Sequence, residues 1–414
     1  MNIIFIFIFK QMESHLALPL LSTVRVSEEV CLCVAATQVL RFHLVTSKAV
    51  LTFKPAFTHQ IFRDEAIVGY EDPSIDIYLD AATLATHVRV SPLGPPPAAA
   101  ASSTSSAGAS AASSASASAT ASTTASTTAS EAPVVEFTNM MQQLVDRDGL
   151  PQKEHIAARS EFDALVRQST SSFAPLGTHV SRFASRAPAW AARGGDTTTT
   201  SSSSATAAPA WYELWRVQPS RCATADRLQL DRLQVMSLYF IDGSSFVDFE
   251  RPGWTIYTLY CNGGGGGDGA RCIAGFVTAH LFTQPFREER PTSLKICQVL
   301  VLPPFQRRGL ASRIVSQIYA DAARANHFEV TVEDPAPTFA LLRDIIDLQL
   351  LEAHLSDERA LELVALPASR ARGRAPLIDA AQRLHILLRI TRKQIVRCVE
   401  MAVSRHSFSP FSCD

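Results

Sequence analysis

An apolar strand, a sharp turn and the start of a helix follow one another between Gln298 and Ser312. The apolar run up to Leu302 is typical of a strand, and two prolines then end it. The pattern Q-x-x-G-x-A follows from Gln306 and opens a predicted helix. The first N–H groups of a helix have no partner inside it, and the helix dipole adds about half a positive charge there. This order therefore predicts an anion site able to hold a diphosphate.

Each residue type in the segment suits such a site. Gly309 permits close approach of the backbone, Ala311 is small, and Arg307 and Arg308 add positive charge. Because the prolines stop strand pairing, backbone groups before them are expected to pair with an extended ligand. The predicted ligand-binding residues are Val299, Leu300, Val301, Gln306, Arg307, Arg308, Gly309, Leu310, Ala311 and Ser312. An ordinary strand-to-helix turn is the alternative, since the pattern arises by chance in an Ala-rich chain.

Glu333 ends the next predicted strand, Phe328 to Glu333, and is a candidate general base. A lysine amine has a pKa near 10.4 and cannot attack a thioester until its proton leaves, so acylation of an amine needs such a base. Apolar surroundings on the strand are expected to raise the carboxyl pKa. Asp334 is expected to assist. The alternative is a solvated acidic turn before Pro335.

Two other residues, Cys297 and His59, are alternative candidates for a direct role in the reaction. Cys297 would allow a covalent acyl-cysteine intermediate, but the sequence shows no activating histidine near it, and a strand thiol is usually packing. His59 is expected to be a buried or turn histidine rather than a catalytic one. The eight cysteines include no CxxC pair, so no metal site is expected and reduced thiols are predicted.

A central domain, residues 211–352, must position these groups. Its strands are predicted at Trp211–Val217, Trp254–Tyr260, Cys272–Phe282, Leu294–Leu302 and Phe328–Glu333, and its helices at Ala225–Ile241, Arg308–Ala325 and Thr338–Leu350. This order predicts an α+β domain in which one crossover helix joins neighbouring strands. The glycine run from Gly263 is expected to be a hairpin tip, because no Lys-Ser/Thr pair follows it.

Low-complexity stretches rich in Ala, Ser and Thr divide the rest of the chain and are expected to be surface inserts. The apolar run near the amino end is too short to cross a bilayer. The predicted division is a disordered leader 1–26, a small mixed amino-terminal domain 27–93 continued at 134–183, inserts 94–133 and 184–210, and a helical carboxy-terminal segment 353–414.

Charge and composition narrow the function. The 414 residues are 47% hydrophobic, which excludes a wholly disordered chain, and the net charge of −1 argues against direct nucleic-acid binding. Ile61 to Asp80 holds six acidic residues against one basic, so it is predicted to attract a basic peptide. A merely solvated face is the alternative.

The motifs resemble a known family. Gln306 to Ala311 is similar to motif A of the GNAT acyltransferase superfamily, which binds the pyrophosphate of acetyl-CoA there. From Glu333 to Asp344 the pattern E-D-P-x-x-x-F-x-x-L-R-D resembles the type B histone acetyltransferase catalytic subunit, a GNAT family. Further similar segments follow the same order between Ser27 and Ser404, at 53–62, 68–70, 173–177, 240–246 and Gly275.

The resemblance implies a GNAT acyl-CoA N-acyltransferase fold, acetyl-CoA as co-substrate and Glu333 as the catalytic glutamate. Asp242 falls at a second acidic position that is usually Glu in the family, and it is the third candidate catalytic residue. The implied substrate is the tail of newly made histone H4, or of a histone of the 2A type, and the implied partner is a WD40-repeat histone chaperone at the loop Thr283 to Ser293. Nucleus and cytoplasm are the expected locations, with no membrane. A GNAT enzyme for another protein or small amine, and a silent histone-binding subunit, are the alternatives.

Overall fold

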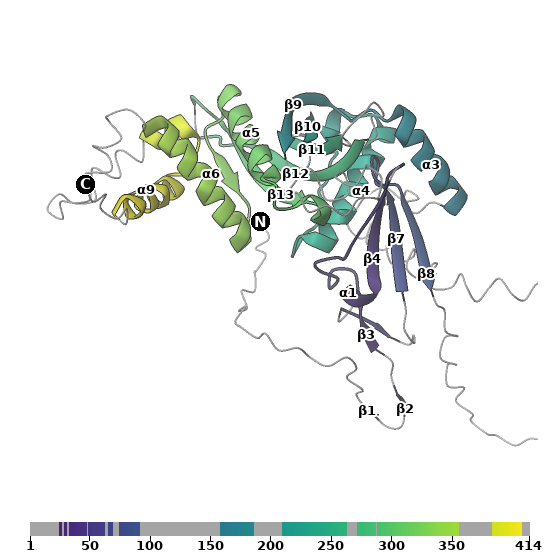
Figure 1. Ribbon diagram of the computed structural model, residues 1–414. Coiled ribbons are helices and arrows are strands. Elements are labelled where there is room, and N and C mark those ends of the chain that lie inside the picture. Colours follow the sequence, from purple (N-terminus) through teal and green to yellow (C-terminus); the bar gives the residue numbers. More distant parts are fainter. Residues whose placement is uncertain are drawn as a thin grey trace, which may run out of the picture.

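The computed structural model describes residues 25–26, 29–30, 33–47, 49–62, 65–68, 74–91, 158–185, 209–262, 271–286, 288–355 and 383–407. The predicted first insert, the glycine-rich tip 263–270 and nearly all of the predicted leader lie outside these ranges. A six-stranded sheet forms the centre, a four-stranded sheet lies beside it, and the carboxy-terminal helices lie at the opposite end (Figure 1).

The central sheet has the order β14-β13-β12-β11-β10-β9. Its strands are β9 (Thr178–Ser185), β10 (Ala210–Val217), β11 (Trp254–Asn262), β12 (Arg271–Thr283), β13 (Thr292–Val301) and β14 (Val330–Val332). Neighbours are antiparallel except β13 and β14, which are parallel and joined through the helix α5 (Leu310–Arg324). The predicted strands, helices and single crossover of the central domain are confirmed.

Helices cover both faces of this sheet. On β11, the Tyr257 hydroxyl donates to Asp321 of α5, whereas the Tyr260 hydroxyl accepts from Gln229 of α4 (Thr224–Phe240). The register of β11 and β12 shifts after Leu259, but the extra residue, Ala274, lies on β12, so β11 itself alternates from Tyr257 to Tyr260 and α5 and α4 lie on opposite sides. Both faces are therefore buried, and this explains why β11 and β12 read as nearly continuous apolar runs.

The amino-terminal sheet has the order β5-β4-β7-β8. It consists of β4 (Leu40–Val45), β5 (Val50–Phe53), β7 (Ser74–Asp80) and β8 (Thr86–Ser91), with β4 and β7 parallel. Smaller elements precede or interrupt it, namely β1 (Arg25–Val26), β2 (Glu29–Val30), β3 (Cys33–Ala35), α1 (Ala36–Val39) and β6 (Ala66–Val68). The predicted small mixed domain is confirmed in these ranges.

The two sheets share one hydrophobic core. Phe42 of β4 packs against Tyr239, with ring centroids 4.8 Å apart, and also against Phe240. The N–H groups of Ala56 and Phe57 both donate to the Tyr239 carbonyl. The amino-terminal domain is therefore built onto the end of α4, next to the loop that carries Asp242.

Residues flanking the second insert form regular structure. The helix α3 (Arg159–Ser172) lies in the predicted continuation of the amino-terminal domain, and its Ser169 donates to Asp80 of β7. Strands β9 and β10 extend into the predicted insert at both ends, where Ser185 and Ala210 are register partners. Alanine fits a half-buried strand as well as a loop, so composition alone set these boundaries too wide.

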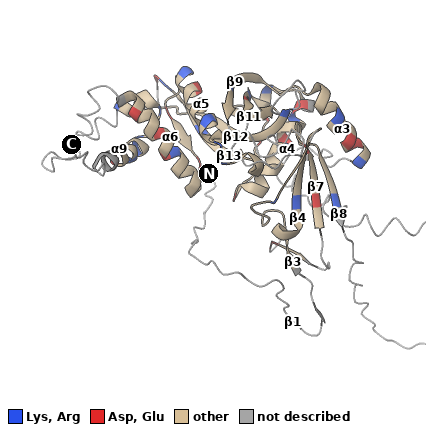
Figure 2. Ribbon diagram, in the orientation of Figure 1, with Lys and Arg blue, Asp and Glu red and all other residues tan. Residues whose placement is uncertain are grey.

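The described part of the carboxy-terminal segment is helical, as predicted, and packs on the core. Residues 383–388 are helical, and α9 (Arg392–Ser407) packs on α6 (Pro337–Leu355) (Figure 1). The inward face of α9 is formed by Ile395, Val399 and Ala402, which are buried. No helix within the described ranges is both long and apolar enough to span a membrane. Charges of both signs are mixed along α3, α5 and α6 (Figure 2).

Candidate active site

The turn before α5 has the geometry of an anion site. Arg307 and Gly309 both have left-handed backbone, with φ of 60° and 72°, and Leu310 is buried and anchors the helix start. The first helical bond runs from the Arg313 N–H to the Gly309 carbonyl. The N–H groups of Leu310, Ala311 and Ser312 therefore have no partner within the helix. A Cβ added at Gly309 would meet no protein atom within 4 Å, so the helix start is open.

The two arginines of this turn differ in their surroundings. The Arg308 guanidinium donates to the Pro304 carbonyl at 3.0 Å, and its own carbonyl accepts from Ser185 at 2.9 Å. Arg308 therefore shapes the turn, whereas the exposed Arg307 is better placed to offer charge to a ligand.

Strand β13 has an open edge after Ile296. Its parallel pairing with β14 covers only Leu294 to Ile296, and the last bond runs from the Glu333 N–H to the Ile296 carbonyl at 2.9 Å. On the other side β12 stays paired through Val301. Among the described residues no strand pairs with β13 beyond Ile296 on the β14 side.

Only part of the predicted backbone set faces that edge. The Leu302 N–H donates to Ala274 of β12, and alternation along the strand turns the Leu300 groups the same way. Val299 and Val301 therefore point to the open edge, where the Val301 carbonyl already accepts from Gln306. Leu300 is buried and holds the register with β12, so the prediction that it pairs with the ligand is wrong.

Gly275 on β12 fixes the position of this part of β13. A Cβ at Gly275 would lie 2.4 Å from the Leu300 carbonyl oxygen, which is well inside contact distance. Only glycine lets the two strands approach this closely. In the sequence, only the resemblance to the family singled out Gly275. The need for a small residue there follows from the register of β12 and β13, which the sequence alone does not give.

Glu333 lies at the rim of the sheet. Its carboxylate pairs with Lys295 at 3.1 Å, and its side chain is 52% exposed. The expected apolar surroundings are wrong, because Glu333 lies one residue beyond β14, whose last residue, Val332, is only partly buried against the core. Asp334 follows with a φ of 34° and is also exposed.

Three further side chains surround this carboxylate. Burial, and then the nearby Glu333 charge, raise the pKa of the Cys297 thiol to about 12. His280 is the register partner of Lys295, and its ring lies 4.6 Å from that of Trp254. Burial, and then the Lys295 ammonium, lower the pKa of His280. Sequence reasoning missed Lys295 and His280, since only the strand register brings them to Glu333.

The loop after α4 lies on the same face. Asp242 pairs with His59 at 3.1 Å, and Gln298 of β13 donates to Ser244 of the same loop at 3.0 Å. Gln298 is the register partner of Thr278. Thr278 and His280 are two residues apart on β12, so their side chains point to the same face of the sheet. His59 also approaches Glu65, at 3.5 Å, so it bridges two carboxylates. It lies in a turn and is partly exposed, which fits the expected turn histidine and not the buried one.

The predicted acidic patch is smaller than its sequence indicates. Asp76 and Asp80 are buried in β7, where Asp76 bonds His43 and Arg89, and Asp80 bonds Thr83 and Ser169. These two carboxylates are unavailable to a peptide. Of the other four, only Glu65 lies in the described ranges.

The Cys297 environment predicts very slow alkylation. A pKa near 12 instead of 9.0 lowers the thiolate fraction at pH 8 by about 10³-fold, so iodoacetamide should label Cys297 about that much more slowly than an ordinary thiol. Mass spectrometry of peptides checks this, with the half-exposed Cys222 as the faster internal comparison. Fast labelling, or an acetyl group retained on Cys297, would instead favour the acyl-cysteine route.

Comparisons with known proteins match both domains. A model described as histone acetyl transferase HAT1 N-terminus matches residues 32–93, and the acetyltransferase (GNAT) family model matches residues 236–338. The second range contains the open edge of β13, the α5 turn and Glu333. The chain is therefore similar to type B histone acetyltransferase catalytic subunits, and residues 236–338 match the acetyltransferase (GNAT) family. Its α+β central domain is the GNAT fold.

The relatives are distant and longer. A type B catalytic subunit of Dictyostelium discoideum is 24% identical, with 76% of this chain and 56% of the relative covered. A type B catalytic subunit of Yarrowia lipolytica is 24% identical, with 84% of this chain and 70% of the relative covered. One of Pyricularia oryzae is 30% identical, with 43% of this chain and 44% of the relative covered. The chain thus spans about half the length of the relatives matched first. A solved soil-metagenome aminoglycoside acetyltransferase, 15% identical over 31% of this chain and 82% of its own, has a TM-score of 0.24, too low to carry any argument.

Proposed function

We propose that this protein is a histone lysine N-acetyltransferase that uses acetyl-CoA and acts on free, newly made histone H4, or on a histone of the 2A type. The observation that carries the proposal is the open edge of β13, flanked by the helix start at Gly309 and by Glu333 at the end of the parallel strand. Similarity to type B catalytic subunits supports the substrate class.

Acetyl-CoA, when bound, supplies an electrophilic thioester. The pantetheine arm suits the free backbone groups of Val299 and Val301, and the pyrophosphate suits the open N–H groups of Leu310 to Ser312. Arg307 adds positive charge at the same end. These residues orient the co-substrate by backbone contacts, which leaves the side chains around Glu333 for the chemistry.

Glu333 is the proposed general base. A substrate ammonium would take the place now held by Lys295, whose Nζ lies 3.1 Å from the carboxylate. Glu333 then accepts the proton, the neutral amine attacks the thioester carbonyl, and coenzyme A leaves as its thiol. Asp334 is the proposed assistant. Asp242, paired with His59 on the same face, is proposed to contact the incoming peptide.

The proposed partner is a WD40-repeat histone chaperone at the loop between β12 and β13. Phe286 in this loop is 98% exposed, and charged residues follow it. An apolar side chain held so far from the core favours a protein contact. Nucleus and cytoplasm are the proposed locations, since free histones pass through both.

The decisive experiment gives the purified protein acetyl-CoA together with a full histone set, a polyamine and a peptide with a free amino terminus. Mass spectrometry then locates the acetyl groups. We expect them on lysines of the H4 tail. Label mainly on the polyamine or the amino terminus would indicate another GNAT activity, whereas histone binding without turnover would indicate a silent subunit.

A further inference from the structure

Strand β14, which carries Glu333, is held along both edges. On one side it pairs with β13. On the other, the Val330 N–H donates to the Arg389 carbonyl at 2.7 Å, and Val330 forms a parallel bridge with Ile390. A three-residue strand at the edge of a sheet has few bonds of its own. Its position therefore depends on the carboxy-terminal segment as well as on β13.

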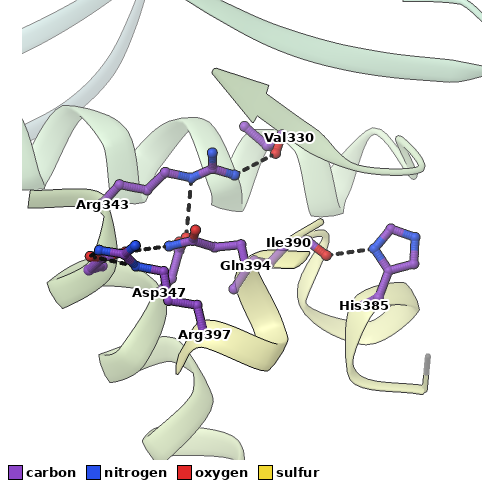
Figure 3. Close-up of polar contacts among 8 residues, drawn as sticks. Val330, Arg343, Asp347, His385, Ile390, Gln394 and Arg397 are labelled. Carbon is purple, nitrogen blue, oxygen red and sulfur yellow. Dashed lines mark hydrogen bonds and ion pairs between the residues drawn. The ribbon is translucent and has the colours of Figure 1, made fainter. Parts of the chain in front are cut away.

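Arg343 of α6 adds a third attachment. Its Nη2 donates to the Val330 carbonyl at 3.2 Å, and its Nε lies 3.2 Å from Asp347, a fully buried carboxylate (Figure 3). The Arg343 side chain itself is 11% exposed. A planar guanidinium presents several donors at once, so one side chain can hold a strand carbonyl and an acid together.

The neighbouring Asp344 attaches α9 to the same helix. Its buried carboxylate accepts two bonds from the Arg397 guanidinium, at 2.6 Å from Nη2 and 2.9 Å from Nε, and one from Gln394 at 2.7 Å. The L-R-D end of the sequence motif thus contacts no open site. One of its residues holds β14 and the next holds α9.

We propose that Arg343 is a positioning residue for acetyl transfer, which sets the place of Glu333 by fixing β14 at Val330. This inference rests on the proposed function. Glu333 is three residues from Val330, about 10 Å along a strand, so a shift at Val330 passes directly to the carboxylate. Displacement of a catalytic group by about 1 Å can cost about 10²-fold in rate.

The test compares Arg343→Met with the double variant Arg343→Met/Asp347→Leu. The single variant leaves a buried carboxylate without its cation and is expected to unfold at lower temperature. The double variant removes that carboxylate and should recover the melting temperature, but it still lacks the bond to Val330. We expect its kcat to fall about 10- to 100-fold, with KM for acetyl-CoA within about twofold of wild type. Arg324→Met, which removes an exposed arginine of α5, is the matched control.

Hydrogen exchange gives a readout independent of turnover. Amides of a peptide covering Val330 to Glu333 should exchange faster in the double variant than in wild type, and stay unchanged in the Arg324 control. Unchanged exchange, or an unchanged kcat per folded molecule, would overturn the positioning role. If wild type transfers no acetyl group at all, the proposed function fails while the exchange measurement still reports on β14.

Discussion

Glu333→Gln is expected to lower kcat for acetylation of an H4 peptide by about 10²- to 10⁴-fold at pH 7.5, the range that general-base catalysis supplies. The amide keeps the size of the side chain but cannot accept the substrate proton. KM for acetyl-CoA should stay within a fewfold, because the coenzyme is assigned to β13 and the α5 turn. Release of coenzyme A thiol, followed continuously, measures both constants.

The pH dependence of the rate of Glu333→Gln tests the general-base role more strictly. The neutral fraction of a lysine amine rises about tenfold per pH unit up to its pKa near 10.4, so the need for a base falls as pH rises. The deficit of Glu333→Gln should therefore shrink between pH 7.5 and 9.5. A variant equally fast at every pH would remove Glu333 as the base. Glu250→Gln, which changes an exposed carboxylate bonded to Arg227, serves as the control and should behave as wild type.

Gly309→Val is expected to raise KM for acetyl-CoA, and the dissociation constant of coenzyme A, by about 10- to 100-fold. A β-branched residue is an outlier at a φ of 72°, and such strain costs about 1–3 kcal/mol. Its methyl groups would also fill the open space beside the first amides of α5, where the phosphates must approach. Calorimetric titration with coenzyme A measures the affinity directly.

A substitution at a second glycine separates the effect of backbone strain from the effect of filling the space assigned to the phosphates. Gly243 also has a left-handed backbone, with a φ of 67°, and also has no atom within 4 Å of an added Cβ. Gly243→Val should therefore carry a comparable strain while binding coenzyme A with wild-type affinity. Equal affinity in the Gly309 variant and wild type would show that the diphosphate does not lie at this helix start.

Local patterns predicted much of this fold, and contacts between distant strands account for what they missed. The prolines after Leu302 and the glycine at 309 marked the end of β13 and the start of α5. The association of Lys295 and His280 with Glu333 depends on the registers of three strands, which no single segment encodes. The prediction of an acidic patch that includes Asp76 and Asp80 was wrong for the same reason. Their partners come from other parts of the chain, and these contacts bury both carboxylates.

Arg343 and Asp344 illustrate a further limit. Their motif was visible and resembled the family, yet their partners come from β14 and from a helix some fifty residues later. A motif reports that residues matter together, but not which of them touch a ligand. In this motif, Glu333 is assigned to the reaction, whereas Arg343 holds β14 in place through its bond to the Val330 carbonyl.

The pairing of Ser185 with Ala210 has a consequence for how this chain can vary. Because the two strand ends already meet, anything between them can lengthen or shorten without cost to the sheet. Ser185 also bonds the Arg308 carbonyl, so the paired ends of β9 and β10 lie next to the turn assigned to the coenzyme diphosphate. A substitution that moves this end of β9 is therefore expected to change the affinity for coenzyme A before any other property of the proposed reaction.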